Sequence, residues 1–237
     1  MSSWVKRIGL IVPDVNVVIE PEANSIVPKE ISIHSSRAIS DFSSSNPLDN
    51  LVNDIPRCAK ELKNANVDVI AFSCTGASFY KGYNFDRKLC QLIEKETNIL
   101  GTTTSTAVVN SLRRLKMKKI ALATPYDEYI NKKEVEFLKD NNFEIVSVVG
   151  LGVRDGREIS NFNLKDAREV AIEANSDKAE CVFISCTNFE TFKIIPGLIK
   201  KLKKPILSSN LATIWEMLYL INYKENMNYD FLFIYSS

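Results

Sequence analysis

Two cysteines in the same short motif are the residues of this sequence best suited to do chemistry. Cys74 lies in AFSCTGASF and Cys186 in FISCTNFETF, and each follows an apolar run as part of Ser-Cys-Thr. A single cysteine after a strand is usually a buried packing residue. Two copies in matched surroundings predict a pair of functional thiols instead.

The residues that follow each cysteine predict an anion site. Both motifs continue into small or polar residues and then an apparent helix start. Unpaired N–H groups at a helix start bind carboxylate oxygens, and the same field lowers the pKa of a nearby thiol. We therefore expect a substrate carboxylate to bind here while the thiols act on the adjacent carbon. The expected binding residues are Thr75, Gly76, Thr187 and Asn188.

A pair of thiols facing one substrate allows two kinds of reaction. One thiolate could remove a proton while the other thiol returns one, as in a racemase. A thiolate could instead add to an activated double bond and leave again. A third hypothesis is a two-lobed protein that binds a carboxylate without chemistry, in which case the cysteines only pack.

The composition argues against several other partners and sites. The 237 residues carry 30 basic and 29 acidic side chains, so the net charge of +1 indicates neither nucleic acid nor an anionic membrane as a partner. The single histidine, His34, makes an imidazole metal site and a Ser-His-Asp triad improbable. We expect no metal and no cofactor. The glycines at 150, 152 and 156 do not have dinucleotide-binding spacing.

The remaining cysteines and the chain start predict a cytoplasmic protein. The five cysteines are odd in number and form no Cys-x-x-Cys pair, which indicates free thiols in a reducing compartment. We expect Cys58, Cys90 and Cys181 to be structural. Neither a signal peptide nor an apolar run long enough to cross a membrane is visible.

Apolar runs alternate with helical patterns along nearly the whole chain. This alternation predicts an α/β protein with mainly parallel sheets covered by helices on both faces. Residues 48–65 have the three- and four-residue apolar spacing of a helix. The predicted strands are residues 8–12, 31–39, 67–73, 99–103, 120–123, 143–149, 181–185 and 205–208.

An internal repeat organises these elements. The offset in position that carries Cys74 onto Cys186 also carries Ile8 onto Ile120 and Pro13 onto Pro125. The repeat predicts two pseudo-symmetric lobes, residues 1–111 and 112–237, each with a four-stranded sheet. Parallel sheets bind ligands beyond the carboxyl ends of their strands, so both cysteines should face one cleft between the lobes. A helix near 210–222 should pack back on the first lobe, whereas the apolar tail 229–237 has no predicted place.

Several motifs together resemble a known family. They are GLIVPDVNVVIEPE, SCTGAS, LGTTTSTAVVNSLRRL, KKIALATPY, SCTNFET and ILSSNLATIWEML. They are similar to the maleate cis-trans isomerase and arylmalonate decarboxylase branch of the aspartate/glutamate/hydantoin racemase superfamily, from residue 8 to about residue 218. The resemblance implies a cofactor-independent enzyme that acts beside a carboxylate of a small mono- or dicarboxylate substrate, with a homodimer as one option.

The resemblance also implies roles for individual residues. The nucleophile of the family falls on Cys74, and its second cysteine falls on Cys186, the opposing acid. Asn16 and Tyr126 match residues that hold the substrate carboxylates. Decarboxylases of the family typically have glycine at the first cysteine position, so two cysteines favour isomerase or racemase chemistry over decarboxylation. The best match that the resemblance implies is an isomerase that converts maleate to fumarate.

Two positions depart from the maleate isomerase pattern. Asp14 replaces a small hydroxyl residue, and a carboxylate near the pocket would repel a dianion and pair with an ammonium group. Gly156 replaces an asparagine that would contact a carboxylate. These departures make an amino-acid racemase of the aspartate or glutamate type the leading alternative, followed by a decarboxylase and the non-catalytic binding protein.

Overall fold

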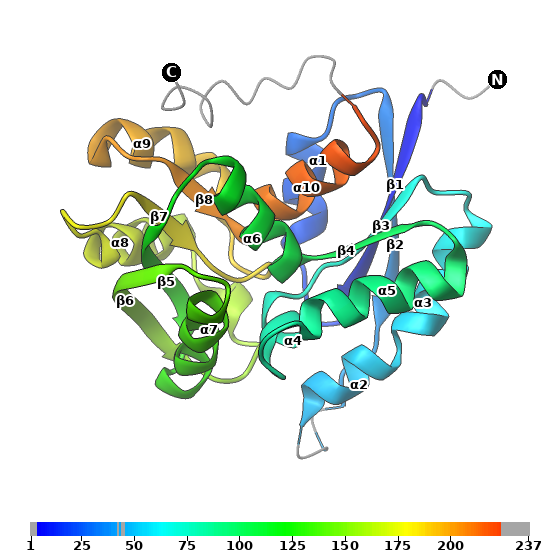
Figure 1. Ribbon diagram of the computed structural model, residues 1–237, viewed down its shortest axis with the longest axis horizontal. Helices are drawn as coiled ribbons and strands as arrows, with labels where there is room; N and C mark the ends of the chain where they lie inside the picture. Colours follow the sequence, from blue (N-terminus) through cyan, green and yellow to red (C-terminus); the bar gives the residue numbers. More distant parts are fainter. Residues whose placement is uncertain (1–3, 42, 44–45, 224–237) are drawn as a thin grey trace.

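Two four-stranded sheets form the frame of the molecule in the computed structural model, which describes residues 4–41, 43 and 46–223 (Figure 1). The first sheet has the order β2-β1-β3-β4 and the second the order β6-β5-β7-β8, and all neighbouring strands are parallel. The predicted two-lobed α/β fold is confirmed. The strands are β1 Lys6–Pro13, β2 Ile31–Ala38, β3 Val69–Phe72, β4 Leu100–Thr103, β5 Lys119–Tyr126, β6 Glu144–Val153, β7 Cys181–Ile184 and β8 Ile206–Ser208.

The repeat in the sequence corresponds to the shared strand order. β7 begins as far after β3 as Cys186 lies after Cys74, and β5 and β6 begin at nearly the same offset from β1 and β2. β8 begins earlier than this offset would place it, because the connection that follows Cys186 is shorter than the one that follows Cys74. The two lobes therefore match closely up to the cysteines and diverge after them.

Helices connect successive strands, as parallel pairing requires. The first lobe contains α1 Ile19–Ile26, α2 Pro47–Asn53, α3 Ile55–Asn64, α4 Thr75–Phe79, α5 Phe85–Thr97 and α6 Thr104–Arg114. The second contains α7 Glu128–Asp140, the 3₁₀ turn η1 Ile159–Asn161, α8 Leu164–Ala174, the 3₁₀ turn η2 Phe192–Ile194, α9 Ile195–Leu202 and α10 Ser209–Leu220.

The helical spacing of residues 48–65 corresponds to two helices, because the chain breaks there into α2 and α3. Asp54 ends the first helix and precedes the second, and Pro56 stands in the first turn of α3. Proline has no N–H to donate and its ring clashes with the preceding turn, so it starts a helix more readily than it continues one.

Helix α10 joins the two lobes. Its residues from Ser209 to Leu218 are buried, and it packs against α6 and α1 as well as β3, β4 and β8. Figure 1 shows this orange-red helix beside α1. Small hydroxyl residues let α6 and α10 approach closely, and Thr104 and Thr213 share a hydrogen bond of 3.0 Å between their hydroxyls.

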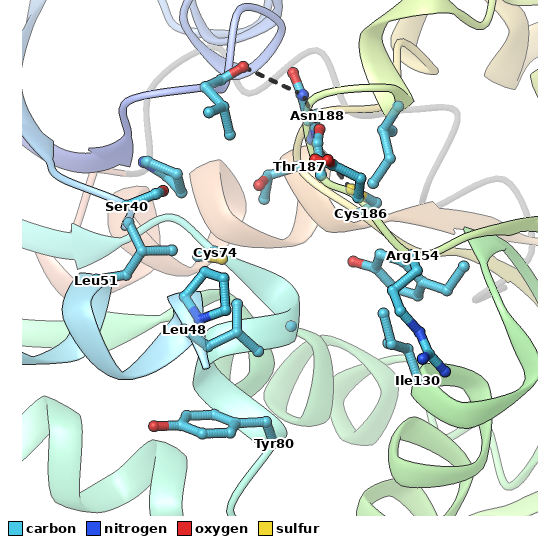
Figure 2. A pocket seen from close by; sticks show the side chains of 18 of the residues that line it. Ser40, Leu48, Leu51, Cys74, Tyr80, Ile130, Arg154, Cys186, Thr187 and Asn188 are labelled. Atoms are coloured by element: carbon cyan, nitrogen blue, oxygen red, sulfur yellow. Dashed lines mark hydrogen bonds between the residues drawn. The ribbon is translucent and has the colours of Figure 1, made fainter. Parts of the chain in front are cut away.

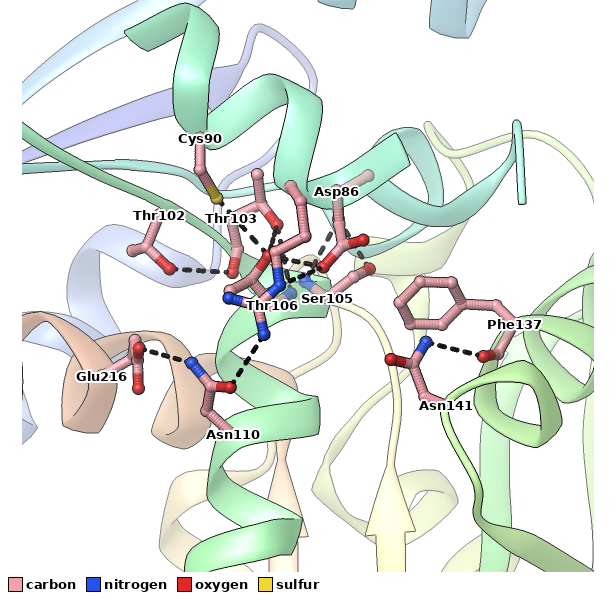
Figure 3. A network of polar contacts seen from close by, with 12 residues as sticks. Asp86, Cys90, Thr102, Thr103, Ser105, Thr106, Asn110, Phe137, Asn141 and Glu216 are labelled. Atoms are coloured by element: carbon pink, nitrogen blue, oxygen red, sulfur yellow. Dashed lines mark hydrogen bonds and ion pairs between the residues drawn. The ribbon is translucent and has the colours of Figure 1, made fainter. Parts of the chain in front are cut away.

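A polar network anchors α6 at this junction (Figure 3). The Thr106 hydroxyl donates to the buried Asp86 carboxylate at 2.6 Å, and the Asn110 amide donates to Glu216 of α10 at 2.8 Å. Arg114 pairs with the same Glu216 carboxylate, which is itself buried. Removing one partner of a buried pair leaves the other unsatisfied, so this network fixes how α6 and α10 meet.

The division at residues 111 and 112 stays a prediction. That boundary lies inside α6, and the apolar tail 229–237 lies outside the described residues. None of the helices in the described part of the chain is both long and apolar enough to span a bilayer.

Candidate active site

A cavity of about 900 Å³ opens between the lobes and receives both cysteines. Figure 2 shows Cys74 and Cys186 at this cavity, with Leu48 and Leu51 across from Ile130. The lining residues are Pro13, Val15, Asn16, Ser40, Asn46, Pro47, Leu48, Leu51, Cys74, Gly76, Phe79, Tyr80, Tyr126, Tyr129, Ile130, Lys133, Arg154, Asp155, Gly156, Arg157, Ile159, Cys186, Thr187 and Asn188.

The backbones of the two cysteines differ. Cys74 precedes α4 in an extended conformation, with φ −140°, and is partly exposed. Cys186 has φ +91° and is only 7% exposed. A side chain with positive φ is strained, and such strain persists where surrounding contacts impose it.

The helical segments after the two cysteines begin at different distances, and the start predicted after the polar residues that follow Cys186 agrees with η2 at Phe192. α4 begins at Thr75, immediately after Cys74, whereas Cys186 is followed by a turn and then η2, and α9 begins only at Ile195. The buried carboxylate of Glu22 accepts hydrogen bonds from the Thr191 and Phe192 N–H groups, which fixes the intervening segment.

Hydrogen bonds across the lobe boundary tie the two motifs together. The Thr187 hydroxyl donates to the Ser73 carbonyl at 3.0 Å. The Ser209 hydroxyl oxygen accepts from the Thr75 hydroxyl and from the Cys186 N–H, each at 3.0 Å. Both loops therefore share partners, and the two thiols are held at one cavity.

Asn16 is held at the cavity by the start of α1. Its side-chain oxygen accepts from the N–H groups of Val18 and Ile19, and its amide nitrogen donates to the Thr187 hydroxyl at 3.0 Å. An amide nitrogen carries two hydrogens, so one remains for a ligand carboxylate.

Tyr126 ends β5 beside the second thiol. Its hydroxyl interacts with the Cys186 thiol, and burial raises the pKa of the phenol well above its usual range. The Asn131 side chain fixes this strand end, because it donates to the Tyr126 carbonyl and accepts from the Thr124 hydroxyl. The phenol is therefore a neutral hydrogen-bond donor near neutral pH.

Burial raises the pKa of both thiols. The pKa of Cys74 rises to about 11 although the Ala77 N–H favours the thiolate, so the predicted lowering by the helix start is wrong. The pKa of Cys186 rises to about 12, against the opposing effects of the Tyr126 hydroxyl and the Asn188 N–H. Desolvation outweighs the local donors in each case. Both thiols carry their protons at neutral pH.

The structure places the other predicted binding residues unequally. Gly76, Thr187 and Asn188 line the cavity, whereas the Thr75 side chain is buried against Ser209. The Asn188 side chain accepts from the Val17 N–H and donates to the Val15 and Gly156 carbonyls, so it clamps neighbouring loops together.

The two departures from the isomerase pattern have different positions. Asp14 is exposed, accepts a hydrogen bond from Ser40 at 2.6 Å and is not among the cavity-lining residues. Asp14 therefore lies next to the cavity, beside the lining residues Pro13 and Val15, and its predicted repulsion of a dianion stays a prediction. Gly156 does line the cavity, where its carbonyl accepts from Asn188.

Sequence reasoning missed the charged wall of the cavity. Three cations, Lys133, Arg154 and Arg157, line it together with the carboxylate of Asp155. The Arg154 guanidinium pairs with Asp127, and Arg157 pairs with Asp155. The two arginines in LGVRDGREIS could have indicated this wall. Arginines in exposed loops are common, however, so the sequence alone does not distinguish them.

The side chains that could ligate a metal are scattered over the residues that the structure describes. Among them, histidine, cysteine, aspartate and glutamate nowhere gather in a group of three or more that could hold an ion. His34 lies on β2, where its ring shares a hydrogen bond with Ser32, and it does not line the cavity.

Comparison with known proteins places this chain in a family. The family model described as arylmalonate decarboxylase matches residues 8–230. A maleate isomerase of Geobacillus stearothermophilus is 26% identical over 232 residues, which cover 92% of each chain. An arylmalonate decarboxylase of Bordetella bronchiseptica is 27% identical over 212 residues, which cover 88% of each.

A solved structure has the same fold. It is a maleate cis-trans isomerase of Nocardia farcinica, in a cysteine-to-serine mutant with a covalently bound succinylcysteine intermediate. The TM-score is 0.86 at 24% identity, with 92% of this chain and 93% of that chain covered. The predicted resemblance is confirmed, and the chain belongs to the arylmalonate decarboxylase family.

Proposed function

We propose that this protein is a cofactor-independent isomerase that converts maleate to fumarate, with Cys74 as the nucleophile. The observation that carries the proposal is the convergence of Cys74 and Cys186 from two lobes on one cavity, with the Tyr126 hydroxyl on the second thiol. The maleate isomerases among its relatives support the same reaction.

The proposed reaction begins when the Cys74 sulfur bonds to one alkene carbon. Before this step the Cys74 thiol gives its proton to water, and during the step the π electrons move onto the neighbouring carbon and its carboxylate. The Cys186 thiol gives that carbon a proton, which produces a succinyl adduct on Cys74. Rotation about the new single bond follows. Return of the proton to Cys186 and cleavage of the C–S bond then release fumarate and regenerate the thiolate.

The charge of the cavity supports a dianionic substrate. Its wall carries the cations of Lys133, Arg154 and Arg157. The carboxylates of Asp127 and Asp155 pair with the two arginines, which leaves one positive charge in excess. We assign the free amide hydrogen of Asn16 and the Tyr126 hydroxyl to the substrate carboxylates, with the backbone N–H groups after Cys74. These donors are fixed by hydrogen bonds before a ligand arrives, which lowers the cost of binding.

The alternatives have less support. A decarboxylase does not need the first thiol, because relatives of that kind resemble this chain with glycine in its place. A racemase was favoured by Asp14, which is exposed and bonded to Ser40 instead of lining the cavity. A binding protein would not need Cys186 in a strained conformation beside a tyrosine donor.

Proton NMR in deuterium oxide tests the proposal. Wild-type protein is incubated separately with maleate, with aspartate and glutamate, and with phenylmalonate. Fumarate signals in the first tube support the proposed isomerase. Loss of only the α-hydrogen signal from an amino acid would replace it with the racemase, and phenylacetate from the third tube would replace it with the decarboxylase. No change in any tube, with a melting temperature raised by maleate, would favour the binding protein.

Two further predictions accompany this function. A homodimer and a cytoplasmic location both stay predictions. The five cysteines are free in the structure, as a reducing compartment would keep them. Sedimentation of the purified protein measures the first, and fractionation of cells that express it measures the second.

A further inference from the structure

A buried carboxylate lies beneath the second cysteine and has no role in the reaction described so far. Glu134 of α7 is 1% exposed. One of its oxygens accepts a hydrogen bond of 2.6 Å from the hydroxyl of Ser185, the residue before Cys186. The other oxygen has no hydrogen-bond partner among the residues that the structure describes. A buried carboxylate with one unpaired oxygen is costly when it is ionised.

The groups around Glu134 are those of the proposed reaction. The elements packed on α7 bring Tyr126 from the end of β5 and Cys74 from the start of α4, and Cys186 follows β7. A charge on Glu134 acts on both Cys186 and Tyr126. On α7 itself, Lys133 lines the cavity, while on β6 the exposed Glu144 pairs with Lys119.

We propose that Glu134 is a positioning residue that, as a neutral carboxylic acid, holds the Ser185–Cys186 segment and keeps Cys186 able to donate its proton. This role rests on the proposed isomerisation. When Glu134 ionises, its negative charge makes the neighbouring thiol and phenol poorer proton donors. The residue therefore sets an upper pH limit for the reaction.

The sign of this effect follows from burial. Desolvation raises the pKa of Glu134 to about 8, against the opposing hydrogen bond from Ser185. The carboxyl group is mostly neutral near pH 7 and mostly ionised at about pH 9. The ionised form raises the pKa of Cys186 and Tyr126. Proton donation by Cys186 should thus weaken as the pH rises through about 8, which opposes the gain from the growing thiolate fraction of Cys74 over the same range.

The first test is the pH profile of turnover by Glu134→Gln. Glutamine keeps the shape and the acceptor for Ser185 but cannot ionise. We expect kcat/KM within about threefold of wild type near pH 7, and roughly tenfold above wild type at about pH 9, because the variant loses the alkaline limit. Glu136→Gln, an exposed position on the same helix, is the matched control and should follow the wild-type profile. Parallel profiles for wild type and Glu134→Gln would overturn the proposal.

The second test needs no turnover of maleate. Wild type and Glu134→Gln are labelled briefly with iodoacetamide from about pH 7 to 10, and the labelled cysteines are identified by peptide mapping. We expect faster labelling of Cys186 in the variant above about pH 8, with little change at Cys74. Equal labelling of Cys186 in the two proteins contradicts the proposal, even if maleate is isomerised. A selective change at Cys186 supports it, even if maleate is not the substrate.

Ser185→Ala provides a variant that keeps the carboxyl group. Loss of the hydroxyl removes the hydrogen bond that lowers the pKa of Glu134. The alkaline limit of activity and of Cys186 labelling should then move to higher pH. A shift to lower pH would show that Glu134 does not control this limit.

Discussion

The two Ser-Cys-Thr loops share a sequence and a place in their sheets, yet they differ in backbone and surroundings. The first continues directly into α4, with a partly exposed Cys74 in a relaxed conformation. The second turns at Cys186 with φ +91°, and its thiol contacts the Tyr126 hydroxyl and the Asn188 N–H. The sequence repeat accounts for two thiols at one cavity. The elements around each thiol give the two cysteines different backbone conformations and different hydrogen-bond partners.

This difference assigns different tasks to the two thiols. A nucleophile must be reachable by the substrate, which suits the partly exposed Cys74. A proton donor acts best from a fixed position at hydrogen-bond distance, which suits Cys186. The near-symmetric frame therefore supports an asymmetric mechanism.

The largest expected effect separates the nucleophile from the structural cysteines. Cys74→Ser should lower kcat by more than about 10³-fold, since loss of one interaction made in the transition state already costs about 10²–10³-fold. Its melting temperature should stay near that of wild type, because Cys74 is partly exposed. Cys58→Ala is the control and should keep its kcat, since Cys58 does not line the cavity. Steady-state kinetics with equal kcat for wild type and Cys74→Ser would reverse the assignment.

A smaller effect concerns the pH dependence of Cys74 alkylation. The pKa of Cys74 is about 11 in the folded protein, so the thiolate fraction is small at neutral pH and grows about tenfold for each pH unit up to about 10. The iodoacetamide rate at Cys74 should grow by the same factor. Labelling that is already maximal near pH 7 would mean that the helix start, not burial, controls this thiol.

The smallest expected effect is on the free energy of unfolding, which depends on the backbone conformation at each cysteine. Cys186→Gly should be about 1 kcal/mol more stable than Cys186→Ala, because glycine has no penalty for positive φ. At Cys74 the order should reverse, by roughly 0.5–1 kcal/mol, since an extended residue gains nothing from glycine. Urea unfolding of the four variants measures both differences. If glycine and alanine variants had the same order of stability at both positions, the proposed difference in backbone strain between the loops would be contradicted.

The sequence was sufficient to predict the strands and the meeting of the two thiols. Apolar runs such as 181–185 end at a cysteine, and in parallel sheets such ends share one edge, so Cys74 and Cys186 could be placed without coordinates. Tyr126 and Asn16 followed from the resemblance.

The differences between the loops could not be predicted, because they depend on contacts distant in sequence. The Cys186 N–H donates to the Ser209 hydroxyl, and the Asn188 amide donates to the Val15 carbonyl. The turn at residue 186 is therefore held by contacts that are distant in sequence. The thiol pKa values depend on how much water the two lobes exclude, which no local pattern records. Glu134 looked like one more charged residue of a helix, although its side chain is buried.

The central claim is that Cys74 bonds to the substrate while Cys186 acts as its acid. The most direct measurement is intact-mass and peptide analysis of Cys186→Ser protein after incubation with maleate. Without the acid thiol, turnover should slow and an adduct with the mass of one maleic acid should accumulate on the Cys74 peptide. An adduct on Cys58, Cys90 or Cys181 with Cys74 unmodified, or undiminished turnover by a Cys74→Ser variant, would contradict the account.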